Sequence, residues 1–122
     1  MSACFWGDEY AQEQIIGDYY ASGLKGSWGE PMSAAYLHFN DEEFGLADAL
    51  LPETLSAAGA SERCIILKGT HNEYYVAKII PGATREVARR NIFGPFNRQA
   101  FKQNLQTING DTLVSFTHRY TI

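Results

Sequence analysis

The pattern of apolar and polar positions predicts a helix at the start of the chain. Asp8 can serve as its N-cap, and Gly23 suits the C′ position at which a helix ends. Between them, the stretch EYAQEQIIGDYYAS carries a rough apolar face, interrupted by Gly17, that consists of Tyr10, Ile15, Ile16, Tyr19 and Tyr20. The residues that follow, 24–31, are rich in glycine and proline and predict a loop.

The second quarter of the chain predicts one strand and one helix. Residues 33–40, SAAYLHFN, alternate loosely, as in a half-buried strand. Asn40 then supplies an N-cap, and Glu43 stands at the capping-box spacing. The predicted helix continues to a break at Pro52 and ends at Gly59. Its apolar positions are Phe44, Leu46, Ala47, Leu50 and Leu51.

A β-hairpin is predicted over residues 64–80, CIILKGTHNEYYVAKII. Two runs dense in isoleucine, tyrosine and valine flank the segment GTHNE, in which Gly69 and Asn72 are turn formers. Both faces of both strands are largely apolar, so we expect central strands that are covered on each side.

The C-terminal part predicts two helices and a strand. Thr84 can cap a helix through Arg90, and the segment FGPF at 93–96 kinks or divides the helical region. A second helix begins near Asn97, with Phe101, Leu105 and Ile108 at i, i+4 and i+7, and the segment 109–111 closes it. Residues 112–122 alternate as a strand whose apolar face holds Val114, Phe116, His118, Tyr120 and Ile122.

From residue 33 onward the predicted order is strand, helix, strand, strand, helix, strand. This is the split βαβ, ferredoxin-like order of an α+β protein, in which two helices cover one face of a single antiparallel or mixed sheet. We therefore expect one domain over residues 1–122, with an N-terminal helix and loop in 1–32 and an α/β sandwich core in 33–122. The alternative is an α+β fold in which the N-terminal helices pack on a curved sheet.

Composition narrows the class of protein. The chain has 122 residues, of which 45% are hydrophobic and 20% are charged, as in a globular domain and unlike a disordered chain. No apolar run approaches the roughly 20 residues that span a bilayer, and the N-terminal residues do not resemble a secretory signal. Cys4 and Cys64 lie far apart and form no metal-binding or redox motif, which favours free thiols in a reducing compartment. We therefore predict a cytoplasmic protein.

The net charge of −4 hides a strong asymmetry. Residues 1–62 carry −10, whereas residues 63–122 carry +6. Such a division is typical of a charged face that meets a charged partner, but the two halves can equally neutralise one another across the folded surface. The sequence leaves both interpretations open.

No motif with a dependable mechanism is present. The sequence contains no phosphate-binding GxxxxGK[ST] loop, no GxGxxG fingerprint and no HExxH zinc motif. His38, His71 and His118 are widely separated, so neither a metal nor a cofactor is predicted. Cys64 lies on a predicted buried strand, where it is expected to behave as a small hydrophobic residue.

One catalytic hypothesis is a metal-independent RNase. Two histidines can act as base and acid near neutral pH while cations hold the phosphate. The candidates are His71 and His118 with Lys68 and Arg119. Against this, the alternation with Phe116 favours a buried structural role for His118, and a turn position favours a solvated His71.

The basic C-terminal half also suggests a nucleic-acid-binding module. Its cations are Arg85, Arg89, Arg90, Arg98 and Lys102, interleaved with Phe93, Phe96 and Phe101. The sequence pI of about 5.3 and the core-like spacing of the phenylalanines argue against nucleic acid as the partner.

The function that the sequence favours is protein binding without catalysis. We predict a small acidic inhibitor or antitoxin-like protein that masks a basic surface on a protein target. Trp6 and Trp28 are candidate aromatic anchors, since tryptophan dominates binding hot spots. The candidate acidic contacts are Glu30, Asp41, Glu42, Glu43 and Asp48. Self-association into a homodimer through exposed strand edges fits the sequence equally well.

Overall fold

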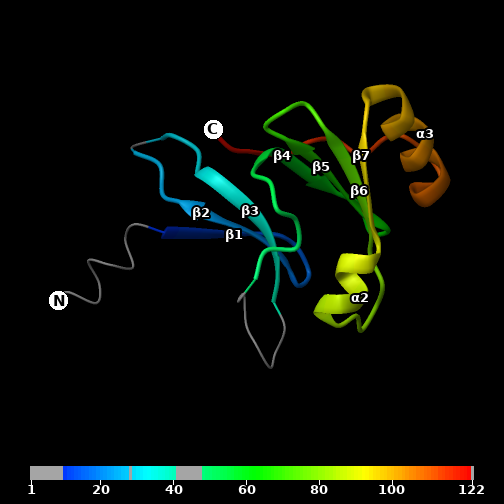
Figure 1. Ribbon diagram of the computed structural model, residues 1–122, viewed down its shortest axis with the longest axis horizontal. Helices are drawn as coiled ribbons and strands as arrows, with labels where there is room; N and C mark the ends of the chain where they lie inside the picture. Colours follow the sequence, from blue (N-terminus) through cyan, green and yellow to red (C-terminus); the bar gives the residue numbers. More distant parts are fainter. Residues whose placement is uncertain (1–9, 28, 41–47, 122) are drawn as a thin grey trace.

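The computed structural model describes residues 10–27, 29–40 and 48–121, and most of its elements are β-strands (Figure 1). Consecutive strands pair as antiparallel neighbours in the order β1-β2-β3-β4-β5-β6-β7, and β8 adds to β4 outside that path. The strands are β1 (Tyr10–Ile16), β2 (Tyr19–Leu24), β3 (Ser33–Phe39), β4 (Leu55–Ala60), β5 (Cys64–Gly69), β6 (Tyr74–Lys78), β7 (Ile92–Phe96) and β8 (His118–Arg119). Two helices lie in the C-terminal part, α2 (Arg85–Arg90) and α3 (Arg98–Asn109).

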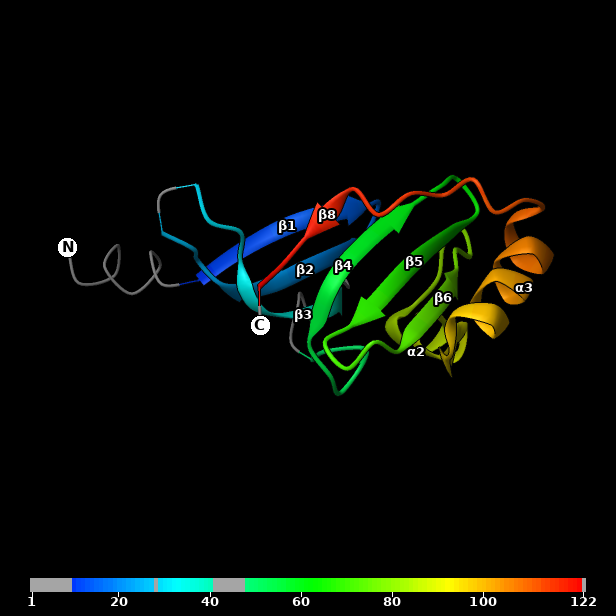
Figure 2. The same cartoon turned by 90° about the horizontal axis from the view of Figure 1, so that it is seen from above.

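The sheet consists of two parts that meet at β3 and β4. Strands β1 to β3 pair along their lengths, as do β4 to β7, but β3 and β4 are joined only at Ala35 and Leu55. Figure 2 shows the two parts turned relative to each other, with β8 lying between β1 and β4. The C-terminal strand therefore links the two parts where the β3–β4 pairing has ended.

Each face of the β4–β7 part has its own apolar core. The inner core lies between this part and strands β1 to β3, and it includes Leu37, Leu55, Ile65, Leu67 and Tyr75. The outer core lies beneath α3, and its buried members are Cys64, Ile66, Val76, Phe101 and Leu105. Because successive side chains of a strand point to opposite faces, the odd and even positions of β5 divide between the two cores.

The predicted N-terminal helix is wrong, because residues 10–24 form the β1–β2 hairpin. Ile16 pairs with Tyr19 across a two-residue turn in which Gly17 has φ +56°. A glycine with positive φ at the first turn position is typical of tight hairpins, and it also interrupts a helix. The same glycine that weakened the helical pattern thus makes the turn.

The helix predicted from Asn40 to Gly59 is also contradicted. Residues 41–47 lie outside the described residues, and the end of the segment forms β4. The alanines of β4 favour a helix locally, but the strand is flanked by β5 on one side and by β3 and β8 on the other. Its pairing partners therefore override its intrinsic preference.

The ferredoxin-like arrangement as a whole is wrong. That fold alternates helices with strands, whereas here the first six strands follow one another without a described helix between them. Two further elements differ from the prediction: FGPF belongs to β7, and the C-terminal strand is reduced to His118 and Arg119. Pro95 fits β7 because β7 is an edge strand, where a missing N–H costs no pairing.

Several local predictions are confirmed. The strand at 33–39 and the hairpin of β5 and β6 are present. Thr84 caps α2 by accepting a hydrogen bond from Val87 N, and Asn97 caps α3 by accepting one from Ala100 N at 2.8 Å. Of the two described helices, neither has the length and apolar character needed to cross a membrane.

Packing at β4 generates a prediction about Gly59. A Cβ atom at this position would overlap the backbone carbonyl of Ser115, whereas one at Gly69 would meet only the movable carboxylate of Glu53, at 2.7 Å. We expect Gly59→Ala to lower the free energy of unfolding by about 1–3 kcal/mol, as overpacking does. Gly69→Ala is the matched control and should cost less, because a side chain can move aside. Urea denaturation followed by circular dichroism measures both; equal losses would show that residues 112–117 do not approach β4 this closely.

Candidate functional site

One face of α3 carries a mixed stripe of cations and apolar residues. Arg98, Phe101, Lys102 and Leu105 follow the i, i+3, i+4, i+7 spacing, so they project from the same side of the helix. Phe101 and Leu105 are buried in the outer core, while Arg98 and Lys102 remain exposed beside them. The helix thereby holds two cations at the edge of its own packing surface.

A second pair of cations comes from the sheet beneath. Ala57 of β4 pairs with Lys68 on one side and with Arg119 of β8 on the other. Paired residues of neighbouring strands point to the same face, so Lys68 and Arg119 flank Ala57 on the outer face. Ala57 itself is buried between them.

Three aromatic rings pack together in the outer core and line the same hollow as these cations. The ring centroid of Phe101 is 4.8 Å from that of Tyr74 and 6.2 Å from that of Phe116. Lys68 Nζ lies 5.7 Å from the centroid of the Tyr74 ring, within the range of a cation–π contact. The rings therefore form a rigid apolar floor and also position one of the cations.

Together these residues line a groove of about 460 Å³, which we call the cationic groove. Its lining consists of Lys68, Tyr74, Arg98, Phe101, Lys102, Leu105, Thr112, Val114, Phe116 and Arg119. Four of the ten are cations and none is an acid or a histidine. Like charges held near one another over an apolar floor create a positive potential that draws anions in.

The structure does not assemble the proposed RNase site. Lys68 and Arg119 line the cationic groove, but His118 precedes Arg119 on β8 and therefore points to the opposite face. His71 is exposed in the β5–β6 turn. The two cations are thus brought together without the two histidines.

His118 lies at a polar contact between β8 and β1. Its Nδ1 atom is 2.6 Å from Glu13 Oε1, which also accepts a hydrogen bond of 3.1 Å from the Tyr120 hydroxyl. The side chain of His118 is 25% exposed, so the residue is not enclosed in an apolar core. The apolar face that Phe116, His118 and Tyr120 were expected to share does not form, because Phe116 packs on the outer core and Tyr120 belongs to the inner core.

Of the acidic binding residues, the structure describes only Glu30 and Asp48. Both are exposed, and they flank opposite ends of β3: Glu30 precedes the strand, while Asp48 precedes Ala49, which bridges to His38. The described pair therefore forms no common patch. Asp41, Glu42, Glu43, Trp6 and Trp28 lie outside the described residues, and their predicted role stays a prediction.

The basic residues predicted to contact nucleic acid divide into two groups. Arg85 and Arg89 of α2 donate to the carbonyls of Phe39 and Ala49, at 3.5 and 3.4 Å, and Arg90 pairs with Glu86 at 2.7 Å. The contacts of Arg85 and Arg89 connect α2 to the end of β3 and to Ala49, whereas the Arg90 pair lies within the helix. From this set, only Arg98, Lys102 and Phe101 reach the cationic groove.

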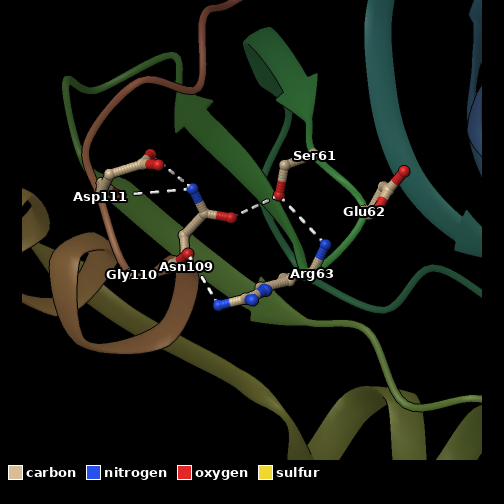
Figure 3. A pocket seen from close by; sticks show the side chains of 6 residues that line it. All are labelled: Ser61, Glu62, Arg63, Asn109, Gly110 and Asp111. Carbon is tan, nitrogen blue, oxygen red and sulfur yellow. Dashed lines mark hydrogen bonds between the residues drawn. The ribbon is translucent and has the colours of Figure 1, made fainter.

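A second, shallower hollow is a structural junction (Figure 3). Ser61 donates to Asn109 Oδ1 at 2.6 Å, and its oxygen accepts from the Arg63 backbone N–H at 3.1 Å. Asn109 Nδ2 in turn donates to Asp111 Oδ1 at 2.9 Å. These polar groups satisfy one another, so the hollow ties the β4–β5 turn to the end of α3.

Cys64 lies directly beneath this junction. Its thiol is fully buried, and burial raises its pKa, with a hydrogen bond to Ser61 acting in the opposite direction. A protonated, enclosed thiol is a poor nucleophile. This agrees with the expectation that Cys64 packs as a small hydrophobic residue.

Comparison with known proteins gives no relative: no family model, no curated protein and no solved structure matches the chain. The cationic groove is therefore interpreted from its own geometry. Sequence reasoning identified all four of its cations, but it assigned Lys68 and Arg119 to one hypothesis and Arg98 and Lys102 to another. Arg119 is brought next to Lys68 because both pair with Ala57, and this pairing has no local signal in the sequence.

The buried tyrosines generate a prediction about alkaline stability. Burial raises the pKa of Tyr120, and the carboxylate of Glu13 adds to the rise; burial, Glu53 and Glu73 raise the pKa of Tyr75. The unfolded chain releases these protons near pH 10, whereas the folded chain retains them to higher pH. The stability that these two tyrosines contribute should therefore be constant below about pH 10 and should fall as pH increases further.

Chemical denaturation between pH 8 and 11.5 tests this expectation. Tyr120→Phe cannot ionise at this position, so its stability should fall less steeply above pH 10 than that of the wild type. Identical slopes for the two proteins would mean that Tyr120 ionises as easily in the folded state as in the unfolded chain.

Proposed function

We propose that the protein is an anion-binding module whose cationic groove holds phosphate groups. The observation that carries the proposal is that four cations from three separate elements converge on one hollow, with no carboxylate among its described lining residues. Arg98 and Lys102 form one row on α3, with their Cβ atoms about 6 Å apart, as is usual for residues at i and i+4. Lys68 and Arg119 form a second row. Their strands lie on either side of β4, so their backbones are roughly 10 Å apart at the ordinary strand spacing.

Two rows of cations across an apolar floor suit a ligand with several negative charges. A ligand lying between the rows can contact both, and each guanidinium can donate two hydrogen bonds to one phosphate. Lysine supplies a compact charge that adjusts to the ligand. The proposal is one of binding and includes no bond cleavage, since the part of the chain that the structure describes brings no acid or histidine to the lining.

Reversing one groove charge should weaken binding selectively. Arg98→Glu should reduce the affinity for inorganic triphosphate by about tenfold or more, because it replaces attraction by repulsion inside the groove. The variant should remain folded, since an acidic residue is favourable in the first turn of a helix. Isothermal titration calorimetry at about 0.1 M salt with EDTA measures the affinity.

Lys25→Glu is the matched control. It changes the net charge by the same amount, and Lys25 is an exposed residue of the connection between β2 and β3. Figure 2 shows this connection at the opposite end of the molecule from α3. Its affinity for triphosphate should stay within about twofold of the wild type, because charges beyond a Debye length of roughly 10 Å are largely screened. No binding by the wild type, or equal losses in the two variants, would refute the proposal.

The acidic N-terminal half supports a second proposal, that it contacts a protein with a basic surface. The supporting observation is the charge of −10 in residues 1–62, with Asp41, Glu42 and Glu43 in succession. The double change Glu42→Lys and Glu43→Lys should slow association with such a partner and leave the melting temperature nearly unchanged. Surface plasmon resonance over a range of salt concentrations measures this; an association rate indifferent to both the substitution and the salt would exclude an acidic binding surface.

A further inference from the structure

The floor of the cationic groove indicates more than charge recognition. Tyr74, Phe101, Leu105, Val114 and Phe116 are half of its lining residues, and they supply its apolar surface. Tyr74, Val114 and Phe116 are partly exposed, and a purely inorganic anion would leave that exposed part in contact with water. A ligand with a flat apolar part would cover it and gain roughly 25 cal/mol for each Å² removed from water.

The dimensions of the groove fit a small molecule. Its volume of about 460 Å³ falls within the usual range of small-ligand sites, about 300–1,000 Å³. Ring stacking beneath α3 holds the floor in place, so the floor is formed before a ligand arrives. Preformed sites of this size favour compact ligands over long, adaptable chains.

The charge around the groove also favours a compact ligand. With the four groove cations set aside, the net charge of −4 leaves −8 for the rest of the chain. Carboxylates adjoin two lining residues in the sequence, since Glu73 precedes Tyr74 and Asp111 precedes Thr112. A long polyanion that left the groove would therefore meet repulsion, whereas a ligand that ends inside it would not.

We infer that the cationic groove binds a nucleotide, with its base over the aromatic floor and its phosphates among Lys68, Arg98, Lys102 and Arg119. A nucleoside triphosphate carries about four negative charges at neutral pH, because its terminal phosphate ionises near pH 6. That charge equals the charge of the four groove cations. The inference rests on the proposed function and adds the base to it.

Three ligands of graded chemistry test the base separately from the phosphates. Calorimetry with EDTA compares adenosine triphosphate, inorganic triphosphate and adenosine on the full chain. We expect the nucleotide to bind about tenfold or more tightly than inorganic triphosphate, and adenosine to bind much more weakly than either. Arg98→Glu should weaken both phosphate ligands together, whereas Lys25→Glu should weaken neither.

The outcomes distinguish nucleotide binding from phosphate binding alone. If inorganic triphosphate binds as tightly as the nucleotide and Arg98→Glu weakens both, the groove is a phosphate site and the nucleotide inference is wrong. If neither ligand binds, the proposed function fails as well. Single-stranded RNA and an acidic peptide serve as competitors for the bound nucleotide. If either polymer displaces the bound nucleotide at a lower concentration than unlabelled nucleotide does, the occupant is a polymer and the inference is overturned.

The floor provides an independent readout. Phe116→Leu keeps an apolar side chain but removes one ring, so it should weaken nucleotide binding while leaving inorganic triphosphate binding unchanged. A thermal melt first establishes that the variant is folded. If that variant loses affinity for both ligands equally, the ring acts through the shape of the groove and not through contact with the base.

Discussion

Strand β4 is enclosed on both faces and along both edges, and the rest of the structure depends on this crowding. β5 pairs with one edge, and β3 and then β8 share the other. Ala58 contributes to the inner core, while Gly59 on the other face lies against the backbone of Ser115. Only small side chains fit in such a position, which explains why the strand after Leu55 consists of serine, alanine and glycine.

The close approach at β4 is also what creates the groove. It brings the C-terminal segment back across the sheet, so that Phe116 stacks on Phe101 and Arg119 lies in register with Lys68 through Ala57. A bulkier residue at Gly59 would push this segment away and would separate Arg119 of β8 from the two cations of α3. Stability and the candidate site thus share one packing constraint.

The charge asymmetry of the sequence acquires a more specific meaning in the fold. Part of the basic excess is used structurally, because Arg85 and Arg89 of α2 donate to backbone carbonyls. Another part is gathered into one hollow, and the lining residues described for it include no acid. An acidic protein can therefore present a localised positive site, since charge recognition over a few ångströms depends on neighbours and not on the total.

The sequence by itself determined the features that depend on nearby residues. Thr84 and Asn97 identified the starts of both described helices, and the apolar runs around GTHNE identified the β5–β6 hairpin, because caps and turns are local hydrogen-bonding and backbone effects. Only the tertiary structure decided that residues 10–24 and 55–60 are strands, since their local patterns were ambiguous or helical and distant partners stabilise the extended form. The cationic groove was decided in the same way: its cations were visible in the sequence, but their convergence requires pairings between residues as far apart as Ala57 and Arg119. Such pairings arise from the packing of the whole chain, and no local pattern records them.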